Sequence, residues 1–391
     1  MNFEQIKKNS AAFLPTYSRE EVCFVKGKNA TLTSITGDKY IDFASGIGVM
    51  SLGYNDHDWN YAIIKQTKNL AHTSNLFYNE PSAKLAKMLT DLSGLSFVFF
   101  GNSGAEANEC AIKLARKYAS DKYEKKRNKI ITLKDSFHGR TLATLSATGQ
   151  EAFHKDFAPL PDGFESVASG DLEGFCEKIL KDDVAAVMVE LVQGEGGVNE
   201  ADKEFIEAVC SMCKSNDILF IVDEVQTGIG RCGSLFLFEK YNICPDIVTL
   251  AKGLGGGLPI GACLADFKLE KVFSPGDHGS TFGGNPVVCA GACVVLSKMT
   301  SNFLKTVNEK GEYIKKELEQ FDEFYDITQQ GLMIGVSLKT MEVKNLVSLL
   351  LENGLVVLSS KHNRLRLLPP LKISYREINK GIKIIRSVLE Q

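Results

Sequence analysis

The side chain with the clearest chemical potential is the amine of Lys252. Lys252 follows the apolar run of residues 247–251 and precedes the glycine-rich run of residues 253–257. A lysine at the end of a buried strand is poorly solvated, which lowers the pKa of its amine and favours Schiff-base formation with an aldehyde. Taken by itself, Lys252 is equally compatible with a surface amine beside a flexible loop.

Asp223 stands in a similar place, at the end of the apolar run of residues 218–222. A partly buried carboxylate needs a partner, because an isolated charge in a low dielectric is costly. Asp223 could serve as a helix cap or in a structural salt bridge. It could also hold a protonated pyridine nitrogen, which keeps the ring electron-deficient and able to accept the electrons of a carbanion.

A third segment, residues 101–109, could bind a phosphate group. After a predicted strand, it begins with the small residues Gly-Asn-Ser-Gly-Ala and continues as the start of a predicted helix. Free backbone N–H groups and the helix dipole make such a start an anion site, although a turn of this kind is more often only a turn. The chain has no Gly-x-x-x-x-Gly-Lys-Ser/Thr, which argues against a nucleoside triphosphatase. Together the three features describe one ligand, a phosphorylated pyridine that carries an aldehyde.

The elements that must position these residues follow an α/β pattern. From residue 51 to 296, short apolar runs alternate with longer helical patterns, and strands are expected at residues 97–100, 130–133, 185–189, 219–222 and 247–250. This alternation predicts a mostly parallel sheet with helices on both faces. Ligands of such sheets bind at the carboxyl ends of the strands, and the candidate residues all follow predicted strands.

The same patterns predict the division into domains. Residues 46–296 should form the large domain, and residues 297–391, with a long helix near 303–320 and strands near 332–338 and 365–367, a smaller α+β domain. Residues 1–45 contain a predicted hairpin and could pack on either domain; we expect them to pack with the small one.

Bulk composition excludes several classes of function. The formal net charge is −3, which argues against nucleic acid as a partner. The N-terminus lacks the layout of a secretory signal, and no apolar stretch reaches the ~20 residues that span a bilayer. Ten scattered cysteines favour a reducing cytoplasm, and the pair Cys210 and Cys213 is expected to be two buried thiols. We expect no metal site and no membrane partner.

Six separated segments resemble those of class III aminotransferases in residue type, order and spacing. They are residues 102–109, 137–140, 193–197, 223–228, 251–253 and 279–286. The resemblance covers nearly the whole chain. It implies a fold-type-I transferase, with a mostly parallel central sheet and a smaller α+β C-terminal domain. It also implies the cofactor pyridoxal 5'-phosphate and a homodimer whose subunits share the active sites.

The resemblance assigns roles to matching positions. Lys252 would form the Schiff base with the cofactor and shuttle the proton, and Asp223 would pair with the pyridine nitrogen. Phe137 and Val225 would cover the two faces of the ring. The remaining cofactor contacts would be Gln226 near the ring hydroxyl, Ser103, Gly104 and Ala105 at the phosphate, and Thr281 reaching the phosphate from the partner subunit.

Within this class the chain most resembles the acetylornithine aminotransferases, through residues 15–19, 74–81 and 364–370. This likeness implies that Arg366 binds the α-carboxylate of 2-oxoglutarate or glutamate, because the planar fork of an arginine meets a carboxylate bidentately. Arg140 would bind the other carboxylate of the substrate. Glu195 would pair with Arg366 while an ω-amine reacts and then swing aside. Tyr17 and Ser280 complete the implied substrate site.

The expected reaction moves the δ-amino group of N2-acetylornithine to 2-oxoglutarate by a ping-pong route and yields glutamate, a step of arginine biosynthesis. Another donor would use the same machinery: ornithine, succinylornithine, N-succinyl-diaminopimelate or 4-aminobutyrate. A lyase or racemase on the same fold would form no glutamate. A cofactor-free scaffold is disfavoured, because Lys252 and Asp223 are both present.

Overall fold

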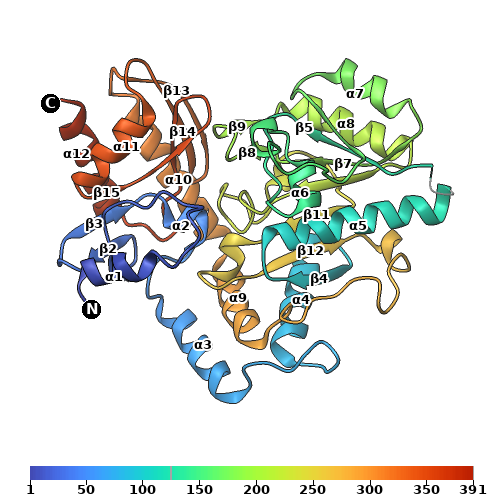
Figure 1. Cartoon of the computed structure of the whole chain (residues 1–391), viewed down its shortest axis with the longest axis horizontal. Coiled ribbons are helices and arrows are strands. Elements are labelled where there is room, and N and C mark those ends of the chain that lie inside the picture. The colour runs from blue at the N-terminus through green and yellow to red at the C-terminus, as the bar shows by residue number, and fades with distance from the viewer. Residues whose placement is uncertain (124–125, 391) are drawn as a thin grey trace.

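The computed structural model describes residues 1–123 and 126–390 of the chain. In Figure 1 the N-terminal strands lie beside the C-terminal helices and strands, and the middle of the chain forms a larger, separate lobe. The larger lobe is built around one seven-stranded sheet. The site residues predicted from sequence lie mostly in the loops at one edge of this sheet.

The central sheet is mostly parallel, as predicted. Its strands lie in the order β4 (Phe97–Gly101), β12 (Gly261–Ala265), β11 (Ile247–Leu250), β10 (Leu219–Asp223), β7 (Val184–Val189), β5 (Lys129–Leu133) and β6 (Phe164–Val167). Strands β11, β10, β7, β5 and β6 pair in parallel, whereas β12 runs antiparallel to both of its neighbours. The sequence patterns missed β12 and β6. Strand β12 has no β-branched or aromatic residue, and β6 is a partly exposed edge strand.

Helices cover both faces of the sheet because its central strands are apolar on both sides. In β7, Ala186 and Met188 pack in the cluster that contains the buried stripe of α5 (Gly104–Tyr123). Val187 and Val189 point to the other face, into the cluster that contains the apolar side of α8 (Lys203–Ser215). This two-sided burial fixes the strand register, because a slip by one residue would exchange the two faces.

Two smaller sheets form the other lobe. Strands β1 (Phe24–Lys28), β2 (Thr31–Ser34) and β3 (Lys39–Asp42) form an antiparallel meander, which β15 (Leu355–Val356) extends by pairing in parallel with β3. The second sheet has the antiparallel order β13 (Phe324–Gln330), β14 (Met333–Leu338), β17 (Arg364–Leu367) and β16 (Leu358–Ser360). The domain boundaries at residues 45 and 296 stay predictions. The pairing of β3 with β15 favours placing the N-terminal segment with the small domain.

The remaining elements are short or lie on the outside. The helices are α1 (Phe3–Ser10), α2 (Ser45–Gly48), α3 (His57–Asn69), α4 (Glu80–Ser93), α6 (Leu142–Ala147), α7 (Leu172–Ile179), α9 (Pro286–Lys298), α10 (Ser301–Leu318), α11 (Val343–Glu352) and α12 (Tyr375–Leu389). The short 3-10 helices are η1 (Glu151–Phe153), η2 (Leu237–Lys240), η3 (Lys252–Gly255) and η4 (Phe267–Leu269), and β8 (Val192–Gln193) pairs with β9 (Asn199–Glu200).

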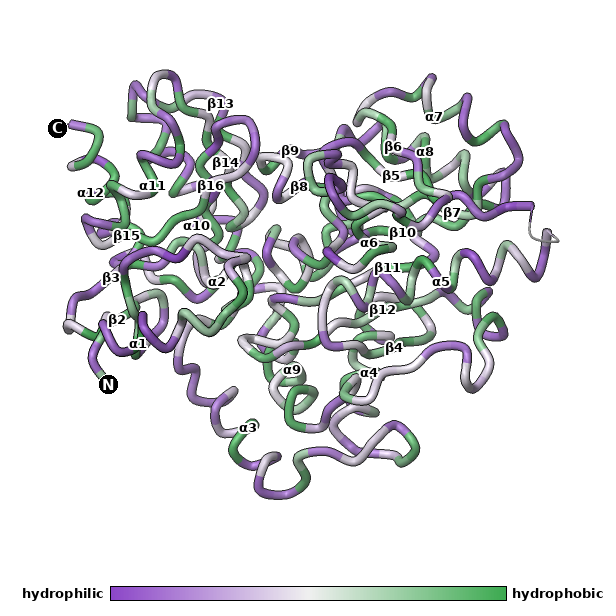
Figure 2. Tube along the Cα trace, in the orientation of Figure 1, coloured by the Kyte–Doolittle hydropathy of each residue, from purple (hydrophilic) through white to green (hydrophobic). Residues whose placement is uncertain are grey.

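Helix α9 is the most apolar helix next to the central sheet. It is coloured mainly as hydrophobic in Figure 2, and seven of its residues are buried. No single helix in the described ranges is long and apolar enough to cross a membrane; α9 and α10 pass that test only as a pair bent by 77°.

Arg231 joins the two lobes through buried hydrogen bonds. It follows β10 in the large lobe and is only 2% exposed. Its Nη1 donates to the carbonyl oxygens of Leu332 (2.9 Å) and Pro369 (2.6 Å), both in the small lobe. The buried carboxylate of Asp42 adds electrostatic attraction. This guanidinium group is therefore one of the buried contacts that hold the two lobes together.

We expect Arg231→Met to lower the free energy of unfolding by roughly 2–5 kcal/mol, because it leaves two buried carbonyl groups without a donor. Urea unfolding followed by circular dichroism measures the change. The control is Arg376→Met at an exposed position, where the expected change lies within about 0.5 kcal/mol. Equal stabilities for the two variants would contradict the role given to Arg231.

Candidate active site

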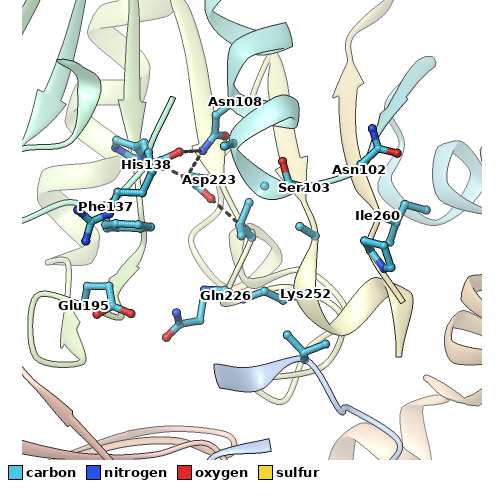
Figure 3. A pocket seen from close by; sticks show the side chains of 18 of the residues that line it. Asn102, Ser103, Asn108, Phe137, His138, Glu195, Asp223, Gln226, Lys252 and Ile260 are labelled. Atoms are coloured by element: carbon cyan, nitrogen blue, oxygen red, sulfur yellow. Dashed lines mark hydrogen bonds and ion pairs between the residues drawn. The ribbon is translucent and has the colours of Figure 1, made fainter. Parts of the chain in front are cut away.

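A cavity of about 510 Å³ opens at the carboxyl ends of the central strands. Figure 3 shows its side chains, with Asn108, His138 and Asp223 grouped together and Glu195 and Gln226 lying apart from them. Ten of the residues predicted from sequence line the cavity: Ser103, Gly104, Ala105, Phe137, Arg140, Glu195, Asp223, Val225, Gln226 and Lys252. The fold therefore brings together segments that are up to 150 residues apart in the chain.

Lys252 enters the cavity from the turn that follows β11. Its φ of +39° lies in the left-handed region, which a residue with a side chain rarely adopts and which only the surrounding structure can enforce. Burial and, to a lesser extent, the nearby charge of Arg366 together lower the pKa of its amine to about 8, against the opposing effect of Glu195 and Asp223. A substantial fraction of the amine is therefore uncharged near neutral pH, as a nucleophile requires.

Asp223, the last residue of β10, is held by a buried network. Its Oδ2 accepts hydrogen bonds from Asn108 Nδ2 and pairs with His138 Nδ1, both at 2.8 Å, and its Oδ1 accepts from the backbone N–H of Val225 at 3.0 Å. Burial disfavours protonation of His138, but the bond to Asp223 and the charges of Asp223 and Glu190 raise its pKa above the ordinary value. The imidazole of His138 and the amide of Asn108 are thus the side chains that stabilise the Asp223 carboxylate inside the protein.

Glu190 is a second buried carboxyl group on the cavity wall. It follows β7, and its Oε2 accepts the backbone N–H of Phe137 at 2.8 Å. Burial raises its pKa to about 7, against the attraction of His138. The hydrogen bond fixes the loop that carries Phe137, and with it the aromatic face that the cavity presents.

The start of α5 forms the predicted anion site. Ser103 caps the helix, its Oγ accepting the backbone N–H of Glu106 at 3.1 Å, and the Glu106 carboxylate accepts the N–H of Asn102. The first N–H groups of the helix have no partner within it and face the cavity edge. Gly104 is tightly packed, since a Cβ there would lie 2.7 Å from Val225 Cγ1.

Arg366 on β17 lies behind the cavity wall and is occupied by an acidic partner. Its Nη1 donates to Glu195 Oε1 at 2.8 Å and to Gln226 Oε1 at 3.3 Å. The arginine is 3% exposed, whereas Glu195 borders the cavity. The guanidinium group of Arg366 is therefore already paired with a carboxylate at the edge of the cavity.

Besides Arg366, three predicted residues are absent from the described lining of the cavity. Tyr17 is 75% exposed, and neither Ser280 nor Thr281 is among the described residues that line the cavity. The Ser280 hydroxyl instead accepts a hydrogen bond from Asn102 Nδ2 at 3.1 Å. Their roles at the site stay predictions.

The residues present fit pyridoxal 5'-phosphate. The cavity lining combines the helix start at Gly104, the buried carboxylate of Asp223 and the amine of Lys252. The aromatic side chain of Phe137 and the aliphatic one of Val225, in the same lining, offer apolar surfaces for a ring. Glycine is required at position 104, because a Cβ there would clash with Val225.

The sequence reasoning missed the roles of Asn108, His138 and Glu190. Asn108 and His138 stood within recognised segments, and Glu190 directly follows a predicted strand. The available signal was a polar residue beside a strand end or in the first turns of a buried helix. What the sequence could not provide was the contact with Asp223, because 115 residues separate Asn108 from its partner.

The comparisons with known proteins agree with this geometry. The family model for class III aminotransferases matches residues 15–389, so the chain belongs to this family. It is 48% identical to the acetylornithine aminotransferase of Haemophilus ducreyi over the full length of both chains. Among solved structures, the ornithine aminotransferase of Toxoplasma gondii has a TM-score of 0.94 at 29% identity, covering 100% of this chain and 95% of that one. The N-acetylornithine aminotransferase of Stenotrophomonas maltophilia has a TM-score of 0.85 at 34% identity, with 98% of each chain covered.

These findings confirm the predicted fold and class. The chain has the fold-type-I architecture and is a pyridoxal-phosphate-dependent aminotransferase. They leave the individual roles of the site residues as predictions, which the geometry above supports to different degrees.

The lowered pKa of Lys252 predicts selective reactivity. In cofactor-free protein, a small acylating reagent should label Lys252 with a rate that is half-maximal near pH 8, since only the neutral amine reacts. Lysines in water titrate near 10.4. Mass spectrometry of the Lys252 peptide across a pH series measures the rate, and exposed lysines of the same sample are the control. A profile for Lys252 that matched theirs would contradict the assignment.

Proposed function

We propose that this enzyme transfers the δ-amino group of N2-acetyl-L-ornithine to 2-oxoglutarate, in arginine biosynthesis. The observation that carries the proposal is the presence of two unequal carboxylate sites, Arg366 masked by Glu195 and Arg140 without an acidic partner among the described residues. The donor has one carboxylate, remote from its reacting amine, whereas glutamate has two. Arg140 would bind the one carboxylate that both substrates have at this end, and Arg366, paired with Glu195, would be needed only for the second carboxylate of glutamate.

The two partial reactions would use the arginines differently. With the donor, Glu195 stays on Arg366, and Arg140 binds the single α-carboxylate. With 2-oxoglutarate or glutamate, the carboxylate next to the reacting carbon displaces Glu195 from Arg366, and Arg140 binds the distal one. A bidentate contact to arginine is specific for a planar carboxylate, so each arginine also fixes the orientation of the substrate.

The residues around the ring would supply positioning and proton transfer. Bound pyridoxal phosphate supplies an electron sink that stabilises negative charge on the substrate carbon. Asp223 would pair with the ring nitrogen and favour its protonated form, and Phe137 and Val225 would pack against the ring. Lys252 would take and return the proton.

The geometry supports a proposal for the other cofactor contacts. Ser103, Gly104 and Ala105 would hold the phosphate at the start of α5, where the N–H groups are free. Gln226 lies beside Arg366 and would reach the ring hydroxyl. Gly194 allows this arrangement, because a Cβ at that position would lie 2.1 Å from Gln226 Oε1.

We further propose that the chain works as a homodimer that shares its active sites. Leu76, Phe77 and Phe282 are exposed apolar residues, between 60% and 87% accessible, which favours burial against another surface. Asn75 ties two of these segments together by donating to the carbonyl oxygens of Ser280 (3.0 Å) and Gly283 (2.9 Å). Residues 280–283 would thus lie against a partner subunit, with Thr281 and Ser280 close to it. Tyr17 would lie against the partner in the same way.

A reducing cytoplasm suits this enzyme, because all ten cysteines are free thiols. The Cys210 and Cys213 pair lies on α8, where Cys213 is fully buried and burial raises its pKa well above the ordinary value. Neither thiol is poised for redox chemistry.

A panel of donors with 2-oxoglutarate tests the function. We expect N2-acetylornithine to give stoichiometric glutamate with a higher kcat/KM than ornithine, succinylornithine, N-succinyl-diaminopimelate or 4-aminobutyrate. The control is Lys252→Ala, which should form no glutamate. A preference for ornithine would replace the proposed donor, and turnover without glutamate formation would exclude transamination.

The dimer proposal predicts the particle mass. Light scattering at micromolar concentration should give twice the mass of one chain, and replacing Phe77 with Asp should lower that mass and reduce turnover together, because the shared sites are lost. A fully active monomer would contradict it.

A further inference from the structure

The guanidinium group of Arg140 rests on an aromatic platform. Its Cζ lies 3.8 Å from the ring centroid of Phe153 and 5.6 Å from that of Phe137. No hydrogen bond or ion pair joins Arg140 to another residue within the described part of the chain, and its side chain is exposed at the edge of the cavity. The stack on Phe153 is thus the closest contact that restrains the guanidinium group.

Such a restraint matters because an exposed arginine has many rotamers. Fixing a free arginine side chain costs up to about 2 kcal/mol of conformational entropy, which binding of a carboxylate would have to supply. Stacking on an aromatic face holds the guanidinium plane while its N–H groups stay free at the edge. Phe153 can therefore set the direction of Arg140 without blocking the groups that bind a carboxylate.

Phe153 is itself held in place from both sides. It ends η1, and the preceding Gln150 donates from Nε2 to the carbonyl oxygen of Ser136 at 3.0 Å. The Nε2 atom of His154, the next residue, lies 2.8 Å from the carbonyl oxygen of Leu145 and 2.8 Å from that of Thr148, at the end of α6. The platform is fixed to the same loop that carries Phe137.

We propose that Phe153 is a positioning residue for substrate recognition: its ring holds Arg140 in the orientation that binds the distal carboxylate of 2-oxoglutarate and the α-carboxylate of the donor. This inference rests on the proposed role of Arg140. It adds a residue outside the cavity lining that determines the preference for substrates with a carboxylate at this end.

Phe153 also contacts Phe137, edge to face, with 6.1 Å between ring centroids. A residue that only supported Phe137 would affect the cofactor and therefore all substrates equally. A residue that orients Arg140 affects only those substrates whose carboxylate Arg140 binds. The two roles are separated by comparing acceptors with and without the second carboxylate.

The experiment uses the holoenzyme and three variants. Phe153→Leu keeps an apolar side chain and removes the aromatic face, whereas Phe153→Tyr keeps the face. We expect Phe153→Leu to raise the KM for 2-oxoglutarate about five- to thirtyfold, with kcat, the KM for pyruvate and the cofactor absorbance unchanged. Phe153→Tyr should restore the wild-type KM. The third variant, Phe321→Leu, removes a matched stack under Arg386, 4.9 Å from the ring, and should leave both KM values unchanged.

Binding gives a readout without turnover. Calorimetry with glutarate, an unreactive dicarboxylate, should show that Phe153→Leu weakens glutarate binding by the same factor as it raises the KM for 2-oxoglutarate. In an Arg140→Met background, the further substitution Phe153→Leu should leave the affinity for glutarate unchanged, because Phe153 acts only through Arg140.

The outcomes separate this inference from the proposed function. If Arg140→Met raises the KM for 2-oxoglutarate but Phe153→Leu does not, the positioning role is overturned and the role of Arg140 stands. If Arg140→Met itself leaves that KM unchanged, the proposed function of Arg140 fails. Equal changes for 2-oxoglutarate and pyruvate in Phe153→Leu would assign Phe153 to the support of Phe137 instead.

Discussion

The active site depends on the hydrogen bonds that hold the carboxylate of Asp223 inside the protein. Asp223 is 4% exposed at the end of a strand whose residues are all buried, so its charge would be unstable without compensation. His138, Asn108 and the N–H of Val225 provide that compensation through three hydrogen bonds. Each comes from a different segment, and their convergence fixes the positions of α5, the Phe137 loop and the Val225 turn.

This constraint also explains why the site lies where it does. The carboxyl ends of β4, β5, β7, β10 and β11 meet at one edge of the sheet, where backbone N–H groups at helix starts are free and the loops leave a cavity. Packing on both faces makes the sheet rigid, so loops attached to it hold their side chains in place. The small lobe contributes Arg366, which Arg231 keeps in register by its bonds to Pro369 and Leu332.

Most strands of the central sheet, and the residues that follow them, were predictable from sequence. Each is an apolar run that ends at a glycine or a charged residue. Lys252 and Asp223 stood out for that reason. The network around Asp223 was not predictable, since contacts such as that of Asn108 depend on the sheet order. Strand β12 was missed because the composition of Gly261–Ala265 favours neither a helix nor a strand. Its extended conformation depends on pairing with β4 and β11. The roles of Thr281 and Tyr17 stay predictions, and the role proposed for Thr281 requires a partner subunit.

The charges near Lys252 constrain how the proposed switch at Arg366 can work. Arg366 lowers the pKa of the Lys252 amine and Glu195 raises it, so the amine responds to the net charge of this pair. When the carboxylate of glutamate replaces Glu195 on Arg366, one negative charge is exchanged for another at the same guanidinium group. The field at Lys252 is thereby largely conserved between the two partial reactions. A neutral residue in place of Glu195 would leave Arg366 uncompensated whenever the donor is bound, and the unpaired positive charge would depress the pKa of Lys252 in that half of the cycle only. In the proposed mechanism, the carboxylate at position 195 would thus distinguish the two substrates and keep the charge near the Lys252 amine similar in both half-reactions.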